Sequence, residues 1–368
     1  MPLKILLTSD LHLGRKFTNC PETVQERLVE ARFACLKRIV EEAGRRRADL
    51  LLVAGDLFDN SRPAKRDIRR AAEILADFQG PLTAVLPGNH DFLAPDDALW
   101  KTFLEASGSR VLVLSERKAY PLSGFNIDAC LYAGPCVSKH SSENAIGWVK
   151  GSAKDPAVAH HVGVAHGSIE GISPDFTADY YPMKRADLDG AGVDLWLIGH
   201  THAPYPAQGS TGPLFCAGTP EPDGFGCDHG GSAWWLELED GGTRAESVAT
   251  GTFRFLHETI DLASMADLSA MAARHAGEAA SRELLKVRLS GRIARGDRET
   301  LAEARRILEE RLLLLADWND AGVRERIDAE AIDREYPRGS FPHGLLTALA
   351  EDAEALDLAH ALLEGARS

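Results

Sequence analysis

The sequence predicts a layered α/β protein with a second, smaller domain toward its C-terminal end. Five short apolar runs, each followed directly by polar residues, are typical of buried strands. Two segments with apolar residues at helical spacing separate the first three runs, which gives the order strand, helix, strand, helix, strand of an α/β fold. A length of 368 residues exceeds a typical single domain. The composition, 44% hydrophobic and 26% charged, is ordinary for a globular protein with a sizeable core.

The opening of the chain alternates strands and covering helices. The five apolar runs cover residues 4–8, 50–54, 82–86, 161–165 and 194–198. The first helix is expected over residues 21–42, because Val24, Leu28 and other apolar side chains recur on one face. A second helix is expected to begin near Pro63, which suits a first helical turn, and to continue to Phe78.

The middle of the chain, from about Val111 to Gly251, changes to short strand-like segments separated by Gly, Pro, Ser and Asp. The expected strands cover residues 111–114, 126–133, 161–165, 194–198, 214–217, 232–238 and 243–249. Asp240-Gly241-Gly242 has the composition of a hairpin turn between the last two. A second sheet, or half of one, is therefore predicted.

The composition changes again after about Arg254, which predicts a first domain over residues 1–253 and a second over residues 254–368. The second domain is expected to hold an edge strand, a second strand and two helical stretches, over residues 257–262, 286–291, 299–315 and 345–363. Leu312 and Leu315 are among the apolar positions assigned to the first of these helices. A small α+β domain follows from this order.

Five short polar motifs follow the five apolar runs. They are Ser9-Asp10-Leu11-His12, Gly55-Asp56, Gly88-Asn89-His90-Asp91, His166-Gly167 and Gly199-His200-Thr201-His202. In α/β folds the ligand site lies beyond the carboxyl ends of the strands. Asp, Asn and His side chains suit Mn, Fe, Zn or Mg, and the absence of cysteine from all five motifs excludes a structural zinc finger. The motifs therefore predict a metal centre.

Two cations about 3.5 to 4 Å apart can share a bridging carboxylate and hydroxide in phosphoester cleavage. Asp56 is the natural bridge, because it is the carboxylate that stands alone in its motif. The remaining predicted ligands are Asp10 and His12 for one metal, Asn89 and His166 for the other, and His200 and His202 for one metal each. His90 follows Asn89 and precedes Asp91, so a protonated imidazole held by a carboxylate is a candidate general acid.

Each motif alone is weak, since Asn, Asp and Gly often form turns. Five motifs in order after five strands make a purely structural role improbable. The histidines outside the motifs are expected to be structural or solvent-facing: His140, His160, His161, His229, His257, His275, His343 and His360. His229 is the one that could line the entrance of the site.

The net charge of −14 argues against a protein that coats nucleic acid by bulk attraction, but it does not exclude nucleic acid as a substrate. The six cysteines lack CxxC spacing, which indicates reduced thiols. No run approaches the about 18 apolar residues of a membrane helix. The N-terminal residues lack the sections of a signal peptide, so a cytoplasmic location is expected.

Basic and aromatic side chains near the motifs could either contact nucleic acid or have only a structural role. Arg45-Arg46-Arg47 and the group Lys65, Arg66, Arg69 and Arg70 could contact DNA phosphates, although basic helix positions are usually a solvated face. Phe17, Phe92 and Trp100 could stack on bases, although packing is the more frequent role.

The motifs resemble those of the calcineurin-like metallophosphoesterase superfamily over about residues 1–250. Thr8 to Gly14, Gly55 to Asp59 with Ser61-Arg62-Pro63, and Gly88 to Asp91 are most similar to the DNA repair nuclease branch that includes the Mre11 and SbcD exonucleases. The resemblance implies a four-layer αββα sandwich with a small C-terminal α+β capping domain. It also implies the seven metal ligands named above, His90 as the catalytic histidine, two divalent ions with Mn as the usual one, homodimerisation, and a Rad50-like or SbcC-like coiled-coil ATPase partner.

The function predicted from the sequence is two-metal hydrolysis of DNA phosphodiester bonds. A small-molecule phosphoesterase acting on nucleotides or cyclic nucleotides would use the same centre. A regulatory subunit of an SbcC/Rad50-like ATPase complex, with the C-terminal domain as its interaction surface, is the alternative from another class.

Overall fold

The computed structural model describes residues 2–366 apart from residues 97, 207–210, 240, 241, 295 and 328. The chain forms two compact units, Met1–Phe255 and Leu256–Ser368. Each unit is described by itself. Within the described residues, no helix is both long and apolar enough to cross a membrane.

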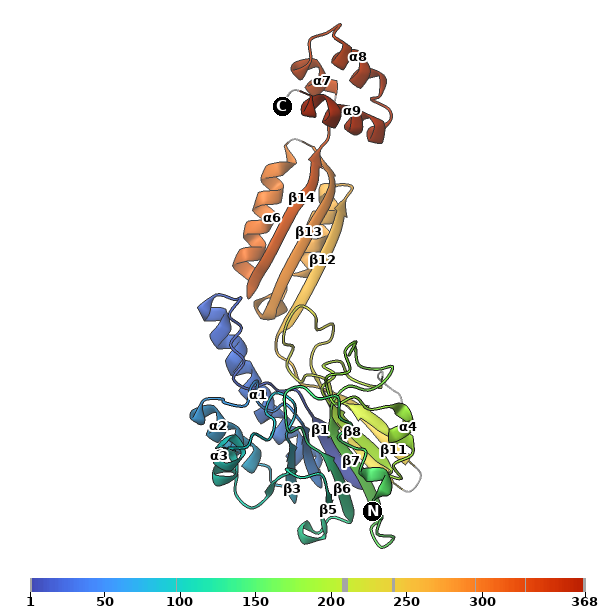
Figure 1. Ribbon diagram of the computed structural model, residues 1–368. Coiled ribbons are helices and arrows are strands. Elements are labelled where there is room, and N and C mark those ends of the chain that lie inside the picture. The colour runs from blue at the N-terminus through green and yellow to red at the C-terminus, as the bar shows by residue number, and fades with distance from the viewer. Residues whose placement is uncertain are drawn as a thin grey trace. The chain divides into compact units, whose positions relative to one another are not determined.

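The first unit contains two sheets (Figure 1). The first has the order β11-β10-β1-β2-β3-β4, with bounds Gly242–Ala249, Ser232–Glu239, Leu3–Thr8, Leu50–Ala54, Leu82–Leu86 and Val111–Val113. The second has the order β5-β6-β7-β8-β9, with bounds Ala119–Pro121, Ala129–Gly134, His160–His166, Leu195–Gly199 and Leu214–Cys216. β1 to β4 pair in parallel, as do β6 to β9. The predicted second sheet is confirmed.

The strands predicted over residues 111–114, 232–238 and 243–249 join the first sheet. β10 pairs antiparallel with β1, and this long-range pairing is invisible to local sequence patterns. β10 and β11 form a hairpin in which Glu239 lies opposite Gly242. Of the hairpin turn predicted at Asp240-Gly241-Gly242, Asp240 and Gly241 lie outside the described residues.

The two sheets of the first unit pack face to face between outer layers that contain helices, so the predicted αββα sandwich is confirmed. Between the sheets lies a core built from both, including Ile5, Leu52 and Val164. The outer face of the first sheet packs against α1 (Glu22–Arg46), α2 (Lys65–Ala76) and α3 (Ala98–Ser107). The outer face of the second sheet is covered by loops, the five-residue helix α4 (Arg185–Asp189) and two short 3-10 turns, η1 (Ser123–Phe125) and η2 (Val149–Gly151). Apolar contact on both faces explains why β2, β3 and β8 are fully buried.

Helix α2 begins at Lys65, with Ala64 as its N-cap, so Pro63 precedes the helix and does not occupy the predicted first turn. Helix α3 was not expected from the sequence. It lies in the outer helix layer, where Trp100 and Phe103 are buried against Phe58. Trp100 is thus a core residue, as the packing alternative predicted.

The second unit contains a three-stranded sheet of order β12-β13-β14 (Figure 1). The strands are Arg254–Leu262, Glu283–Ile293 and Leu314–Glu325, and an apolar core joins them to α5 (Met265–Arg274) and α6 (Asp297–Arg311). The 3-10 turn η3 spans Glu278–Arg282. Three helices follow: α7 (Ala329–Glu335), α8 (Phe341–Ala348) and α9 (Ala353–Gly365). The small α+β domain is confirmed.

The helix predicted over residues 299–315 was placed too far toward the C-terminus. Leu312 is the C-cap of α6, and Leu315 lies in β14, which the sequence did not reveal. The reason is that Leu312 to Leu315 form a continuous apolar run, which fits the end of a helix and the start of a strand equally well. The stretch over residues 345–363 is divided between α8 and α9.

Candidate metal centre

The five predicted motifs converge at the carboxyl ends of β1, β2, β3, β7 and β8. The loop after β1 is tied to the loop after β2, because Asp10 N donates to the carbonyl of Gly55 (3.1 Å) and His12 N donates to that of Asp56 (3.0 Å). Asp10, His12, Asp56 and His200 all have left-handed backbone conformations, with φ of 55°, 46°, 53° and 95°. Such conformations cost about 1–3 kcal/mol each and are typical of functional sites. Strain is therefore concentrated at the predicted ligands.

Asp10, His12 and His202 form the first group of side chains that could hold a cation. The Nε2 atoms of His12 and His202 are 3.2 Å apart, and His202 Nε2 is 3.9 Å from Asp10 Oδ1. Asp10 is held in place by the Ser9 hydroxyl, which donates to its Oδ2 (2.6 Å), and by the backbone N–H of His200. Two imidazole nitrogens directed at each other beside a carboxylate form a donor set that suits a divalent transition metal.

Asn89, His166 and His200 form the second group, together with Asp56. His166 Nε2 is 3.0 Å from Asn89 Oδ1 and 3.3 Å from Asp56 Oδ2, and His200 Nδ1 is 3.3 Å from Asn89 Oδ1. The amide nitrogen of Asn89 donates to the carbonyl of Lys139, which leaves the amide oxygen facing the two imidazoles. The two histidines of the His200-Thr201-His202 motif thus lie in different groups.

Asp56 lies between the two groups. Its Oδ2 is 3.7 Å from His12 Nε2 and 3.3 Å from His166 Nε2. Its Oδ1 accepts the backbone N–H of His90 at 2.8 Å, which fixes the carboxylate. One oxygen atom is thus within reach of both groups, as a bridging ligand requires.

The ionisation of these groups is strongly altered by burial. Burial by itself would lower the pKa of His166, but the carboxylate of Asp56 raises this pKa to about 9. Burial lowers the pKa of His200 to about 3 and that of His12 well below its usual range. Burial would raise the pKa of Asp56, but His166 and His12 hold this pKa below its usual range. His12 and His200 are therefore neutral at pH 7 and are ready to act as metal ligands.

The burial of the donor set also fits metal ions. His12 Nδ1 lies 3.6 Å from Asp59 Oδ1, so Nε2 is the nitrogen of this ring that faces the first group. Asp10, His12, Asp56, Asn89 and His166 are at most 2% exposed, so without a cation two carboxylates and two imidazoles would share a nearly dry site. Divalent ions would neutralise the carboxylates and accept the imidazole lone pairs.

His90 is placed beside the first group, with its ring 4.7 Å from that of His12. Its Nδ1 lies 2.9 Å from the backbone carbonyl of Asp59 and donates to that oxygen. The carboxylate of Asp91 accepts the backbone N–H groups of Phe58 (3.0 Å) and Gly88 (2.7 Å). The carboxylate of Asp91 was predicted to hold the His90 imidazole, but the backbone carbonyl of Asp59 holds it instead. Burial raises the pKa of Asp91 to about 7. Its two backbone hydrogen bonds indicate that this carboxyl group shapes the loop.

Several residues around the site were missed by sequence reasoning. Asp223 Oδ2 is 3.0 Å from His202 Nδ1, and the Tyr180 ring lies 4.9 Å from that of His200. Neither residue belongs to a motif, so no local signal could have found them. His229, singled out from the sequence, donates from Nε2 to the backbone carbonyl of His202 (2.7 Å) and thereby supports that ligand loop.

Several basic side chains of the two groups near the motifs form ion pairs. Arg45 and Arg46 pair with Glu42, and Arg70 pairs with Glu30. Phe17 lies between Arg15 and Arg32, with the two guanidinium carbons 5.5 and 5.4 Å from its ring centre. These contacts favour the solvated-face and packing alternatives at these positions.

Residues 3–204 match the calcineurin-like phosphoesterase family, and the chain belongs to this family of metal-dependent phosphoesterases. An uncharacterized metallophosphoesterase of Bacillus subtilis, YhaO, is 29% identical over 213 residues, 54% of this chain and 48% of that protein. The DNA double-strand break repair protein Mre11 of Methanopyrus kandleri is 25% identical over 232 residues, 60% of this chain and 49% of that protein. Mre11 of Archaeoglobus fulgidus is 33% identical over 131 residues, 34% of this chain and 27% of that protein. The chain thus matches about half the length of the first two relatives.

Proposed function

We propose that this phosphoesterase hydrolyses phosphodiester bonds of DNA at a centre of two divalent ions, most suitably Mn. The observation that carries the proposal is the position of Asp56 Oδ2 between two separate groups of ligands. Asp10, His12 and His202 would hold one ion, and Asn89, His166 and His200 the other. When bound, the two ions would activate a water molecule and neutralise the phosphoryl oxygens.

His90 is proposed as the general acid. Because its Nδ1 hydrogen is committed to the carbonyl of Asp59, Nε2 is the atom that can carry a transferable proton. The backbone N–H of His90 is fixed by Asp56, so the acid and the proposed bridging ligand are positioned together. The proton would pass from Nε2 to the oxygen that leaves phosphorus.

The choice of DNA as substrate is supported by relatives named as DNA double-strand break repair proteins. A loop beside the centre adds a structural argument. Ser173 Oγ lies 2.5 Å from Thr201 Oγ1, and Tyr180 packs on His200, so the loop is anchored on both sides of Phe176. Phe176 is 98% exposed. An exposed aromatic ring on a braced loop can stack on an unpaired base.

The second unit, over residues 254–368 in the sequence-based division, is proposed as a capping and interaction domain. Phe341 of α8 and Leu358 and Leu362 of α9 are 76%, 64% and 67% exposed. Exposed apolar side chains on neighbouring helices favour a protein partner, for which a coiled-coil SbcC/Rad50-like ATPase is our proposal. Homodimerisation and a cytoplasmic location complete the proposal.

The deciding experiment compares the wild type with His90→Ala in Mn on single- and double-stranded linear DNA. Bis-p-nitrophenyl phosphate and a cyclic nucleotide serve as small substrates. We expect the wild type to release nucleotides and the variant to lose about 10²–10⁴-fold in rate. If the wild type turns over only the small substrates, the proposed substrate would be a small phosphodiester instead of DNA. Two bound Mn ions without turnover of any substrate would favour the regulatory subunit.

A further inference from the structure

His202 differs from His12 and His166 in its exposure and in its outer partner. Its side chain is 38% exposed, whereas those of His12 and His166 are at most 1% exposed. His166 is oriented by a neutral backbone carbonyl, since its Nδ1 donates to Ala54 O at 2.9 Å. His202 Nδ1 instead lies 3.0 Å from Oδ2 of Asp223, whose side chain is only 13% exposed. A partly exposed imidazole is thus paired with a largely buried carboxylate.

Asp223 is itself held in place. Arg15 Nη1 donates to the same Oδ2 at 3.1 Å, and the guanidinium of Arg15 is steadied by the Phe17 ring. On its other side, the His202 loop is held by His229, which bonds the backbone carbonyl of His202. The backbone of His202 is therefore supported independently of Asp223. What Asp223 adds is the direction of the imidazole ring and the position of its proton.

The contact between His202 Nδ1 and Asp223 fixes the tautomer. With the hydrogen on Nδ1, the lone pair of Nε2 points toward His12 Nε2 at 3.2 Å and Asp10 at 3.9 Å. A carboxylate behind a metal-binding histidine raises the basicity of the ring, and its loss typically lowers metal affinity about 10–100-fold. The described contacts of Asp223 lead to His202 and Arg15 and to no member of the Asn89 group.

We propose that Asp223 is a positioning residue that orients His202 and so sets the affinity of one of the two cation sites, the one formed by Asp10, His12 and His202. This inference rests on the proposed dinuclear centre. Its consequence is an asymmetric centre, in which one ion depends on a carboxylate outside the five motifs and the other does not.

The test titrates metal-free protein with MnCl2 by calorimetry and records the electron paramagnetic resonance spectrum at two Mn per chain. The wild type is expected to bind two ions and to show the spectrum of a spin-coupled pair. In Asp223→Ala we expect the affinity of one site to fall about 10–100-fold while the other is unchanged. At Mn concentrations that fill the wild type, the variant should then show the six-line spectrum of an isolated ion.

Two further variants make the result specific. Asp223→Asn keeps the shape and one acceptor oxygen but removes the charge, so an intermediate loss is expected, and it stands in for the alanine variant should that one not fold. Arg15→Gln removes the other partner of the same oxygen but keeps the carboxylate behind His202, so the affinity of this site should fall less than in Asp223→Ala. Equal weakening of both sites, or two wild-type affinities in Asp223→Ala and Asp223→Asn, would overturn the inference. A wild type that binds fewer than two ions would instead refute the dinuclear centre, and two bound ions without DNA cleavage would refute only the choice of substrate.

Discussion

Manganese binding is expected to compete with a proton on His166. The ring donates from Nδ1 to the carbonyl of Ala54, so a second proton would sit on Nε2, which faces Asn89 and Asp56 where a cation would lie. Although burial opposes it, the carboxylate of Asp56 raises the pKa of His166 to about 9. At pH 7 this proton must leave before the ion binds. Two pH units below the pKa correspond to about a 100-fold loss of affinity, or about 2.7 kcal/mol.

The assay is calorimetric titration of Mn between pH 6.5 and 9.5, repeated in buffers of different ionisation enthalpy to count released protons. We expect the affinity of one site to rise about tenfold per pH unit and to level off above pH 9. His12→Ala keeps His166 and should show the same dependence on pH at the site that contains His166. Burial holds the pKa of His12 well below its usual range, so this ring carries no second proton to release. An affinity that stays constant for both sites from pH 7 to 8.5, without proton release, would refute the reasoning.

The same pKa shift makes a statement about the stability of the metal-free protein. A histidine whose pKa is raised by folding stabilises the folded state fully below its unfolded pKa of about 6.5. That contribution is lost as the pH rises through about 9. The melting temperature of metal-free protein should therefore decline across this window, and saturating Mn should abolish the decline.

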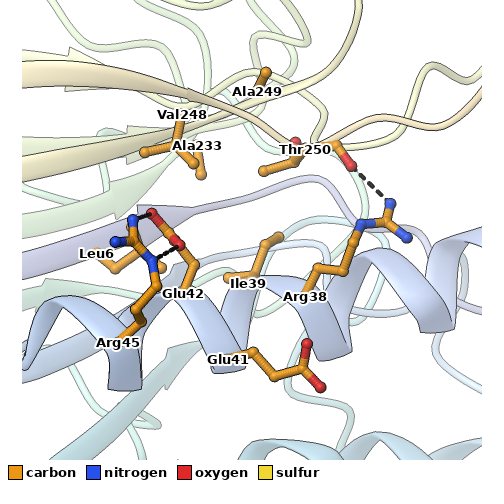
Figure 2. Close-up of a pocket in the computed structure, with 10 residues that line it drawn as sticks. All are labelled: Leu6, Arg38, Ile39, Glu41, Glu42, Arg45, Ala233, Val248, Ala249 and Thr250. Carbon is orange, nitrogen blue, oxygen red and sulfur yellow. Dashed lines mark hydrogen bonds and ion pairs between the residues drawn. The ribbon is translucent and has the colours of Figure 1, made fainter.

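Three further predictions concern other parts of the chain. Asp56→Asn removes the oxygen within reach of both ligand groups, so kcat on bis-p-nitrophenyl phosphate should fall about 10³-fold; a loss below tenfold would contradict a bridging role. Glu42 lines a groove of about 410 Å³ between α1 and the β10–β11 hairpin, and hydrogen bonds from Arg45 lower its pKa to about 2 (Figure 2). Glu42→Gln should therefore reduce the free energy of unfolding by at most about 1 kcal/mol at pH 7, and the difference measured by urea unfolding should shrink as the pH falls below 4.5 toward 2. Phe176→Ala should raise KM for single-stranded DNA about tenfold without changing turnover of the small diester. Phe341 is an exposed phenylalanine of the second unit, and Phe341→Ala should change neither quantity. Equal KM values for the wild type and Phe176→Ala would exclude stacking.

The sequence by itself determined the chemistry and the class of fold. Each proposed ligand lies within the four residues that follow a short apolar run. A buried parallel strand delivers the residues after it to one edge of its sheet. Asp10, Asp56 and Asn89 could therefore be grouped without knowing any contact. The same local logic gave helix α1, the second sheet and the α+β character of the C-terminal unit.

The tertiary structure decided what depends on partners distant in the chain. Pairing of β10 with β1 assigned the last two strands of the first unit to its first sheet. The carbonyl of Asp59, and not the carboxylate of Asp91, holds His90. Asp223 reached His202 across a loop that carries no motif. A ligand type is encoded by one residue and its strand, but the direction of its ring and the site of its proton are set by whichever group packs behind it, and only the folded chain brings that group into place.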